Sequence, residues 1–221
     1  METQKITLTI DGRTVTVPAG TTLWEAARQA GIDIPVLCHS PRLAPVGVCR
    51  LCVVDTGERV LAAACVRPCA EGMQVRTDTE EIHAHQKVLL ELLLADYPEA
   101  SARDTSSGDD ALLALARARG ITDIPFPDGR PAGRGPDNSS PVIAVDHTAC
   151  ILCDRCIRAC DGLQQNHVIG RTGKGYTAAI AFDLNQPMGA SSCVACGECM
   201  AVCPTGALTD KSLAGLRLRD A

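Results

Sequence analysis

Residues 150–160 read CILCDRCIRAC, and residues 193–203 repeat the pattern as CVACGECMAVC. Both runs have the cysteine spacing C-x2-C-x2-C-x3-C. Three thiolates spaced two residues apart can converge on three corners of an iron–sulfur cube, while the fourth thiolate points elsewhere. Zinc or a scaffolding role is the alternative, but neither gives a reason for two tandem runs of this spacing. The runs therefore predict two [4Fe-4S] clusters.

The pair of runs resembles the two-cluster ferredoxins, in which the fourth cysteine of each run serves the other cluster. The resemblance implies one cluster on Cys150, Cys153, Cys156 and Cys203, and a second on Cys193, Cys196, Cys199 and Cys160. The second run ends in Cys-Pro, whereas Cys160 is followed by Asp161. This departure weakens the symmetry of the runs but leaves four ligands for each cluster.

Composition limits the class of protein. The chain has 221 residues, 13 cysteines and a formal charge of −5, which disfavours binding to nucleic acid. It does not open with a basic segment followed by an apolar one, so we expect the thiols to be reduced in a cytoplasmic protein. The longest apolar run, residues 88–94, is far too short to span a bilayer, so no membrane insertion is expected.

The N-terminal pattern predicts a hairpin followed by a helix. Apolar and polar residues alternate over 5–10 and resume at 15–17, after the turn signal Asp11-Gly12. Thr21 or Thr22 can then cap a helix that ends before Gly31. This order favours a small β-grasp-like domain, with a generic α+β start as the alternative.

Four further cysteines, Cys38, Cys49, Cys52 and Cys65, have the spacing C-x10-C-x2-C-x12-C in a loop rich in Pro and Gly. Four thiolates suit a [2Fe-2S] cluster with two on each iron. Zinc sites made of four cysteines usually use two short pairs, whereas Cys38 and Cys65 are isolated in sequence. A [2Fe-2S] cluster is therefore expected here. Cys69, the thirteenth cysteine, is expected to be a small packed residue.

Motifs in both parts of the chain resemble those of a known family. Residues 3–80, with the motifs GVCRLC at 47–52 and CVRPCAEGM at 65–73, look like the N-terminal [2Fe-2S] domain of the large iron–sulfur subunit of respiratory complex I. That domain recurs in the diaphorase iron–sulfur subunit of NAD-reducing nickel–iron hydrogenases, in iron-only hydrogenases and in NAD-linked formate dehydrogenases. Residues 146–207 are especially similar to the hydrogenase diaphorase subunit, including LNQP at 184–187.

The chain departs from that family after a helix expected to end near Asp96. Relatives commonly continue with His-x3-Cys-x2-Cys-x5-Cys, which binds another cubane. Laid on this sequence, the spacing falls on Tyr97, Ser101, Asp104 and Asp110. Hydroxyls and scattered carboxylates cannot replace soft thiolates, so we expect this cluster to be absent.

The predicted fold class is α+β, in three parts. Residues 1–78 form a β-grasp [2Fe-2S] ferredoxin-like domain and residues 142–221 a ferredoxin-like domain with two [4Fe-4S] clusters. Between them, residues 79–141 hold the helix, a loop over 101–110, a short helix over 111–119 and a Pro/Gly-rich linker over 125–141. In the C-terminal domain, a strand is expected over 177–182. The glycine-rich segment 170–175 lacks the P-loop spacing and is expected to be a turn.

No dinucleotide fingerprint and no nucleophile–base set is present, so we expect no substrate-converting centre in the chain itself. The predicted cofactors, one [2Fe-2S] and two [4Fe-4S] clusters, indicate single-electron transfer. The resemblance implies a hetero-oligomer in which the chain relays electrons between a flavoprotein subunit that oxidises or reduces NAD(P)(H) and a catalytic subunit.

Hydrogenase ranks first as that catalytic partner. A molybdenum or tungsten formate dehydrogenase is the alternative, but its relatives often fuse this module to the catalytic chain, whereas this chain stops soon after the second cysteine run. The lost His/Cys motif and the short chain disfavour a complex I subunit. An iron–sulfur redox sensor is the alternative from another class, but no DNA-binding or signalling domain is visible.

Overall fold

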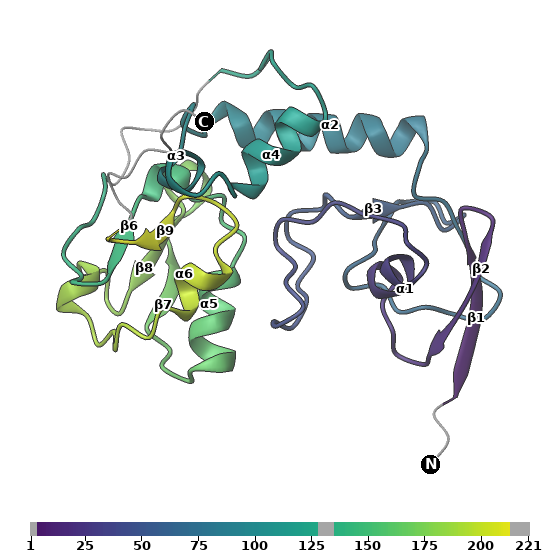
Figure 1. Cartoon of the computed structure of the whole chain (residues 1–221), viewed down its shortest axis with the longest axis horizontal. Helices are drawn as coiled ribbons and strands as arrows, with labels where there is room; N and C mark the ends of the chain where they lie inside the picture. Colours follow the sequence, from purple (N-terminus) through teal and green to yellow (C-terminus); the bar gives the residue numbers. More distant parts are fainter. Residues whose placement is uncertain (1–3, 128–134, 213–221) are drawn as a thin grey trace. The chain divides into compact units, whose positions relative to one another are not determined.

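The computed structural model describes residues 4–127 and 135–212 (Figure 1). Contacts between Cα atoms divide the chain into two compact units. The first unit comprises Met1–His39 and Pro45–Leu89, and the second comprises Ser40–Ala44 and Leu90–Ala221. The α+β class predicted from the sequence is confirmed, with small sheets and short helices in both units. The domain boundaries at 78 and 141 stay predictions.

A three-stranded sheet organises the first unit. β1 (Lys5–Ile10) and β2 (Arg13–Pro18) form the predicted antiparallel hairpin around Asp11-Gly12, and β5 (Gln74–Val75) pairs in parallel with β1. The sheet order is therefore β2-β1-β5. The alternating side chains Leu8 and Ile10 are almost fully buried, so one face of the hairpin forms a core.

Helix α1 (Leu23–Gln29) covers that core. Thr22 caps the helix in a capping box with Glu25, in which the Thr22 side chain accepts from the Glu25 amide and the Glu25 carboxylate accepts from the Thr22 amide. Of the two candidate caps, the structure selects Thr22. The helix buries Leu23 and Trp24 and ends just before Gly31, whose φ of +72° favours glycine.

The loop cysteines of the first unit are connected by short elements. β3 (Val53–Val54) and β4 (Ala62–Ala63) form an antiparallel pair that lies in sequence between Cys52 and Cys65. The long helix α2 (Glu80–Ala95) follows. Its side chains at Ile82, Gln86 and Leu90 are buried, as the four-residue spacing of one helix face requires.

Two antiparallel strand pairs frame the second unit. β6 (Ile143–Val145) pairs with β9 (Leu208–Asp210), and β7 (Ile169–Thr172) pairs with β8 (Ala179–Phe182). The short helices of this unit are α5 (Arg155–Arg158), which continues as a π turn over Ala159–Leu163, and α6 (Glu198–Val202). Single 3-10 turns occur at His147–Ala149, Gly175–Thr177 and Met188–Ala190.

Two sequence expectations for this unit were wrong in part. Residues 101–110 are not only a loop, because α3 (Ala102–Ser106) forms there, with the Ser101 side chain accepting from the Asp104 amide as its N-cap. Residues 170–175 are not only a turn, because β7 extends to Thr172. The sequence did not indicate its pairing with β8, because Gly170 lies inside the strand and Gly173 directly follows it.

The expected short helix is α4 (Ala111–Ala118), capped by Asp110. Part of the predicted Pro/Gly-rich linker, residues 128–134, lies outside the described residues. Asp137, in the described C-terminal part of that linker, is held against strand β6. The Asp137 amide donates to the Val145 carbonyl at 2.8 Å, and the Val145 amide donates to the Asp137 carbonyl at 3.0 Å. The Asp137 carboxylate also accepts from the Met188 amide.

Candidate iron–sulfur sites

The four predicted [2Fe-2S] ligands of the first unit lie together. The Cys38 amide donates to the Cys49 sulfur at 3.4 Å, and the Cys49 amide donates to the Cys38 sulfur at 3.5 Å. The Cys65 thiol lies in hydrogen-bonding contact with those of Cys38 and Cys52. The two isolated cysteines and the C-x2-C pair therefore converge in one place.

Because these thiols pack closely, their pKa values are shifted in opposite directions. Hydrogen bonds from Cys49 and Cys65 lower the pKa of the Cys38 thiol, and a hydrogen bond from Cys65 lowers the pKa of Cys52. The pKa values of Cys49 and Cys65 are raised, chiefly by the hydrogen bond that each thiol makes with Cys38, and burial adds to the effect. Four thiolates cannot coexist here without positive charge between them, which iron in a cluster provides.

The backbone of this cysteine loop turns sharply where the motif GVCRLC begins. Gly47 has φ +65°, and a Cβ atom there would lie 3.3 Å from the Val66 side chain. Arg50, between Cys49 and Cys52, also has a left-handed φ of +58°. The loop thus requires glycine at position 47 both for its conformation and for its close approach to Val66.

A cavity in the second unit, here called the Cys150 cavity, is lined by all four cysteines assigned to the first cubane, Cys150, Cys153, Cys156 and Cys203. Ile180 and Leu208 contribute to its apolar wall. Three of the cysteines come from the first run and one from the second. The structure thus brings together this set from both runs.

The second cavity, here called the Cys193 cavity, is lined by Cys160, Cys193, Cys196 and Cys199. Its other lining residues are Ile143, Asn166, Val168 and Ile169. Again one cysteine comes from the opposite run. Each cavity encloses about 310 Å³ of empty space, part of it open to solvent. Within the described residues, no three His, Cys, Asp or Glu side chains are arranged around a single metal ion.

Burial makes the cavity thiols poor acids without metal. It raises the pKa values of Cys153 and Cys199 to about 12, and it also raises the pKa of Cys156 well above its ordinary value. Neighbouring cysteines add to this effect. A metal-bound thiol is deprotonated, so the positive charge of iron would offset the cost of burying these sulfurs. The chemistry of the donor set fits iron–sulfur clusters in both cavities.

The backbone of the two runs follows the same path. Leu152 and Ala195, each two residues after the first cysteine of its run, have φ values of +54° and +52°. Asp154 and Gly197, four residues after that cysteine, have φ values of +60° and +81°. Only Gly197 signalled this conformation in the sequence, because left-handed φ values favour glycine. The repeat is thus one of backbone shape as well as of cysteine spacing.

Comparison with known proteins finds a family for each of two separate parts of the chain. Residues 3–80 match the family of 2Fe-2S iron–sulfur cluster binding domains, and residues 140–209 match the ferredoxin-like domain of NADH-quinone oxidoreductase subunit 3. Among solved structures, a chain of an NAD+-reducing [NiFe]-hydrogenase in the H2-reduced state is 32% identical, with a TM-score of 0.86 over 96% of this chain and 90% of that one. The chain belongs to this family of iron–sulfur electron-transfer subunits.

Curated relatives of this iron–sulfur subunit are larger proteins. NADP-reducing hydrogenase subunit HndD of Solidesulfovibrio fructosivorans is 36% identical over 93% of this chain and 36% of its own length. The mitochondrial NADH-ubiquinone oxidoreductase 78 kDa subunit of Candida albicans is 31% identical over 95% of this chain and 29% of its own length. The chain thus spans about a third of the length of these two relatives.

The four positions on which the His/Cys spacing falls are polar in this iron–sulfur subunit, and three of them form one hydrogen-bonded group. Tyr97 and Ser101 donate their hydroxyl protons to one oxygen of the Asp110 carboxylate, at 2.5 and 2.6 Å. These three residues are buried. Asp104, the fourth position, instead forms a bidentate ion pair with Arg117 on α4. Three of the four positions thus converge, and they present oxygen atoms to one another.

Cys69 is the one cysteine that is not assigned to a cluster. It is buried in the hydrophobic core of the first unit, and burial raises the pKa of its thiol. It lines neither cavity of the second unit. The expectation of a small packed residue is confirmed.

The described part of the iron–sulfur subunit contains no helix that is long and apolar enough to cross a membrane.

Proposed function

We propose that this subunit holds three clusters and relays single electrons between an NAD(P)-linked flavoprotein subunit and a catalytic subunit, in a hetero-oligomeric cytoplasmic complex. The observation that carries the proposal is the crossing of the cysteine runs. Each cavity of the second unit is lined by three cysteines of one run and one of the other. This arrangement is the ligand pattern of a two-cluster ferredoxin.

The two cavities and the four neighbouring thiols of the first unit support one ligand set for each cluster. Cys38, Cys49, Cys52 and Cys65 would hold a [2Fe-2S] cluster, and the Cys150 and Cys193 cavities would each hold a [4Fe-4S] cluster. When bound, the clusters supply one-electron redox chemistry. The protein supplies the sulfur ligands, and apolar walls such as Ile180 and Val168 limit access of water.

Hydrogenase is the catalytic partner that the comparisons favour. Two of the relatives named above are an NADP-reducing hydrogenase subunit and a chain of an NAD+-reducing [NiFe]-hydrogenase, and both names pair a nicotinamide cofactor with H2 chemistry. We therefore place hydrogenase ahead of formate dehydrogenase. The choice between NAD and NADP stays open because both cofactors occur in these names.

Iron analysis tests the cluster content. The protein is purified anaerobically together with any co-purifying subunits. Two, four and four irons give about ten per chain, and electron paramagnetic resonance of the reduced protein should resolve one [2Fe-2S] and two [4Fe-4S] signals. Two irons per chain, or stoichiometric zinc, would refute the proposal.

Reduction by NADH or NADPH tests the relay. In the isolated complex, either nucleotide should reduce all three clusters through the flavoprotein subunit, and H2 should reduce them from the catalytic side. A redox sensor would instead co-purify without a flavoprotein and would not be reduced by the nucleotides. Identification of the co-purifying subunits by mass spectrometry separates hydrogenase from formate dehydrogenase.

A further inference from the structure

The two cavities of the second unit differ in the charge around them. Around the Cys150 cavity, four arginines donate hydrogen bonds to main-chain carbonyls of the two cysteine segments. They come from four different parts of the unit: α3, the two ends of α5, and strand β7. They are Arg103, Arg155, Arg158 and Arg171.

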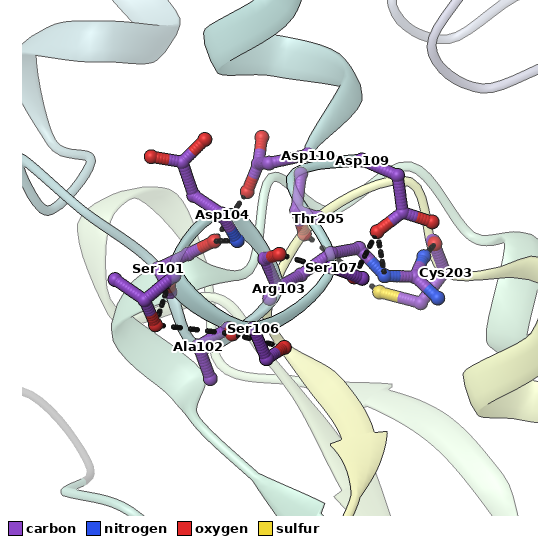
Figure 2. Close-up of polar contacts among 12 residues, drawn as sticks. Ser101, Ala102, Arg103, Asp104, Ser106, Ser107, Asp109, Asp110, Cys203 and Thr205 are labelled. Atoms are coloured by element: carbon purple, nitrogen blue, oxygen red, sulfur yellow. Dashed lines mark hydrogen bonds and ion pairs between the residues drawn. The ribbon is translucent and has the colours of Figure 1, made fainter. Parts of the chain in front are cut away.

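Of these four arginines, Arg103 lies farthest in sequence from the residue whose carbonyl it binds. Helix α3 directs its guanidinium to the carbonyl oxygen of Cys203, as Figure 2 shows. The Arg103 side chain is 20% exposed, and its ion-pair partner Asp109, at 3.4 Å, is 60% exposed. Solvent therefore screens the negative partner more than the positive one, and positive charge remains next to this cysteine.

The other three arginines surround the first run. Arg155 donates to the carbonyl of Val202 at 3.2 Å, and Arg158 to that of Cys153 at 3.4 Å. Arg171 donates to the carbonyl of Leu152 at 2.7 Å and pairs with the Asp154 carboxylate. All four guanidinium groups thus lie against the main chain that carries the four cysteines of this cavity.

The Cys193 cavity has a different setting in the described part of the chain. Its lining residues besides cysteine are apolar or neutral, whereas the lining of the Cys150 cavity includes one carboxylate, Asp154, which is paired with Arg171. Acidic residues directly adjoin two of its cysteines in sequence: Glu198, next to Cys199, pairs with Arg42, and Asp161, next to Cys160, pairs with His167. Each of these two carboxylates thus has one basic partner of its own.

We propose that the cluster in the Cys150 cavity has the higher reduction potential of the two cubanes, and that Arg103 is one of the residues that raises it. The inference rests on the proposed function, in which one electron from NAD(P)H adds one negative charge to a cluster. Nearby cations stabilise the reduced form over the oxidised form, because reduction potential depends on the charge and hydrogen bonds around the cluster. The electron therefore resides on this cubane before the other.

A redox titration monitored by electron paramagnetic resonance tests the order on the anaerobically purified complex. Cys156→Ser first identifies the signal of the Cys150 cavity by its loss. In the wild-type protein that signal should appear at a higher potential than the signal of the other cubane. Absence of both cubane signals refutes the proposed function, whereas two signals in the reverse order, or at equal potential, refute only this inference.

Paired variants separate the effect of the arginine's charge on the potential from any effect of the substitution on the structure. Arg103→Gln removes the positive charge and should lower the potential of the Cys150-cavity cluster alone, whereas Arg103→Lys keeps the charge and should retain most of the potential. Arg171→Gln should act in the same direction and serves if Arg103→Gln fails to fold. Arg119→Gln, on an exposed residue at the end of α4, is the matched control. Unchanged potentials in Arg103→Gln and Arg171→Gln would overturn the role of the arginines.

Discussion

The Tyr97 hydroxyl donates a 2.5 Å hydrogen bond to the fully buried carboxylate of Asp110. The same carboxylate accepts from the Ser101 hydroxyl and, through its other oxygen, from the amides of Leu112 and Leu113 at the start of α4. One side chain therefore caps α4 and holds the segment before α3. The Gly206 amide also approaches the Tyr97 oxygen, at 3.4 Å, close to the second cysteine run.

Loss of this carboxylate should destabilise the second unit strongly. Asp110→Ala leaves two buried hydroxyls and two helix amides without their acceptor, and we expect a loss of about 3 kcal/mol or more. For a chain of this size, that loss corresponds to a fall of roughly 6–12 °C in the midpoint of thermal unfolding. Circular dichroism of the anaerobically purified protein measures the midpoint. Asp123→Ala, on an exposed residue, should change it little; an equal loss in both variants would contradict the role of Asp110.

The Tyr97 hydroxyl should also give the protein a sensitivity to high pH. Burial, followed by the hydrogen bond to Asp110, raises the pKa of Tyr97 above its ordinary value. In the unfolded chain a tyrosine loses its proton near pH 10, whereas the folded state retains it. The resulting stabilisation is complete below about pH 10 and is lost as the pH rises towards the folded pKa.

Comparison of Tyr97→Phe with the wild-type protein checks this dependence. At pH 7 the variant should be less stable by about 1–2 kcal/mol because Asp110 loses a donor. Above pH 10 the wild-type midpoint should fall more steeply than that of the variant, so the difference between them shrinks. Tyr176→Phe is the control, since Tyr176 is 68% exposed and should show neither effect. A constant difference from pH 7 to pH 11 would contradict the prediction.

The crossing of the cysteine runs predicts which variants behave alike. Cys203→Ser should remove the same cubane signal as Cys156→Ser, although Cys203 belongs to the second run. Cys160→Ser should remove the same signal as Cys199→Ser. Electron paramagnetic resonance of each reduced variant distinguishes the two signals. If the ligands followed the runs instead, Cys160→Ser would match Cys156→Ser. Cys69→Ser should leave every signal in place.

A helix residue should support the proposed [2Fe-2S] site. Gln86 on α2 is 2% exposed, and its side-chain amide donates to the carbonyl of Leu51, next to Cys52, at 3.1 Å. Gln86→Ala removes this bond and leaves a buried carbonyl without a donor, at a cost of about 1–2 kcal/mol. The visible absorbance of the [2Fe-2S] cluster should therefore disappear at a lower temperature. His85→Ala, on the exposed side of the helix, should leave that temperature unchanged.

Much of the fold was predictable because its strongest signals are local. Alternation over 5–10, the turn at Asp11-Gly12 and a threonine before Leu23 each specify backbone structure over a few residues, and the hairpin and capped helix follow from them. Cysteine spacing is a local signal of the same kind, because the spacing within a run limits where its first three sulfurs can meet.

The remaining features depend on partners distant in sequence. Ser101 to Asp110 has the polar composition of a loop, and its helix forms where Ser101 caps it and Arg103 reaches Cys203, a hundred residues away. The pairing of β7 with β8 brings Ile169–Thr172 into a strand that its own residues, Gly170 among them, favour weakly. Neither the buried Tyr97–Asp110 group nor the arginines around the Cys150 cavity have a signature in the sequence.

The crossing of the two runs also has a consequence for the order of biosynthesis. The four proposed [2Fe-2S] ligands are complete once Cys65 has been made, and the rest of the first unit follows within residues 66–89. The Cys193 cavity acquires its fourth cysteine only at residue 199, and the Cys150 cavity only at residue 203. Both proposed cubanes therefore depend on residues made after the first run, and a chain that stops before residue 199 would retain only the proposed [2Fe-2S] ligands as a complete set.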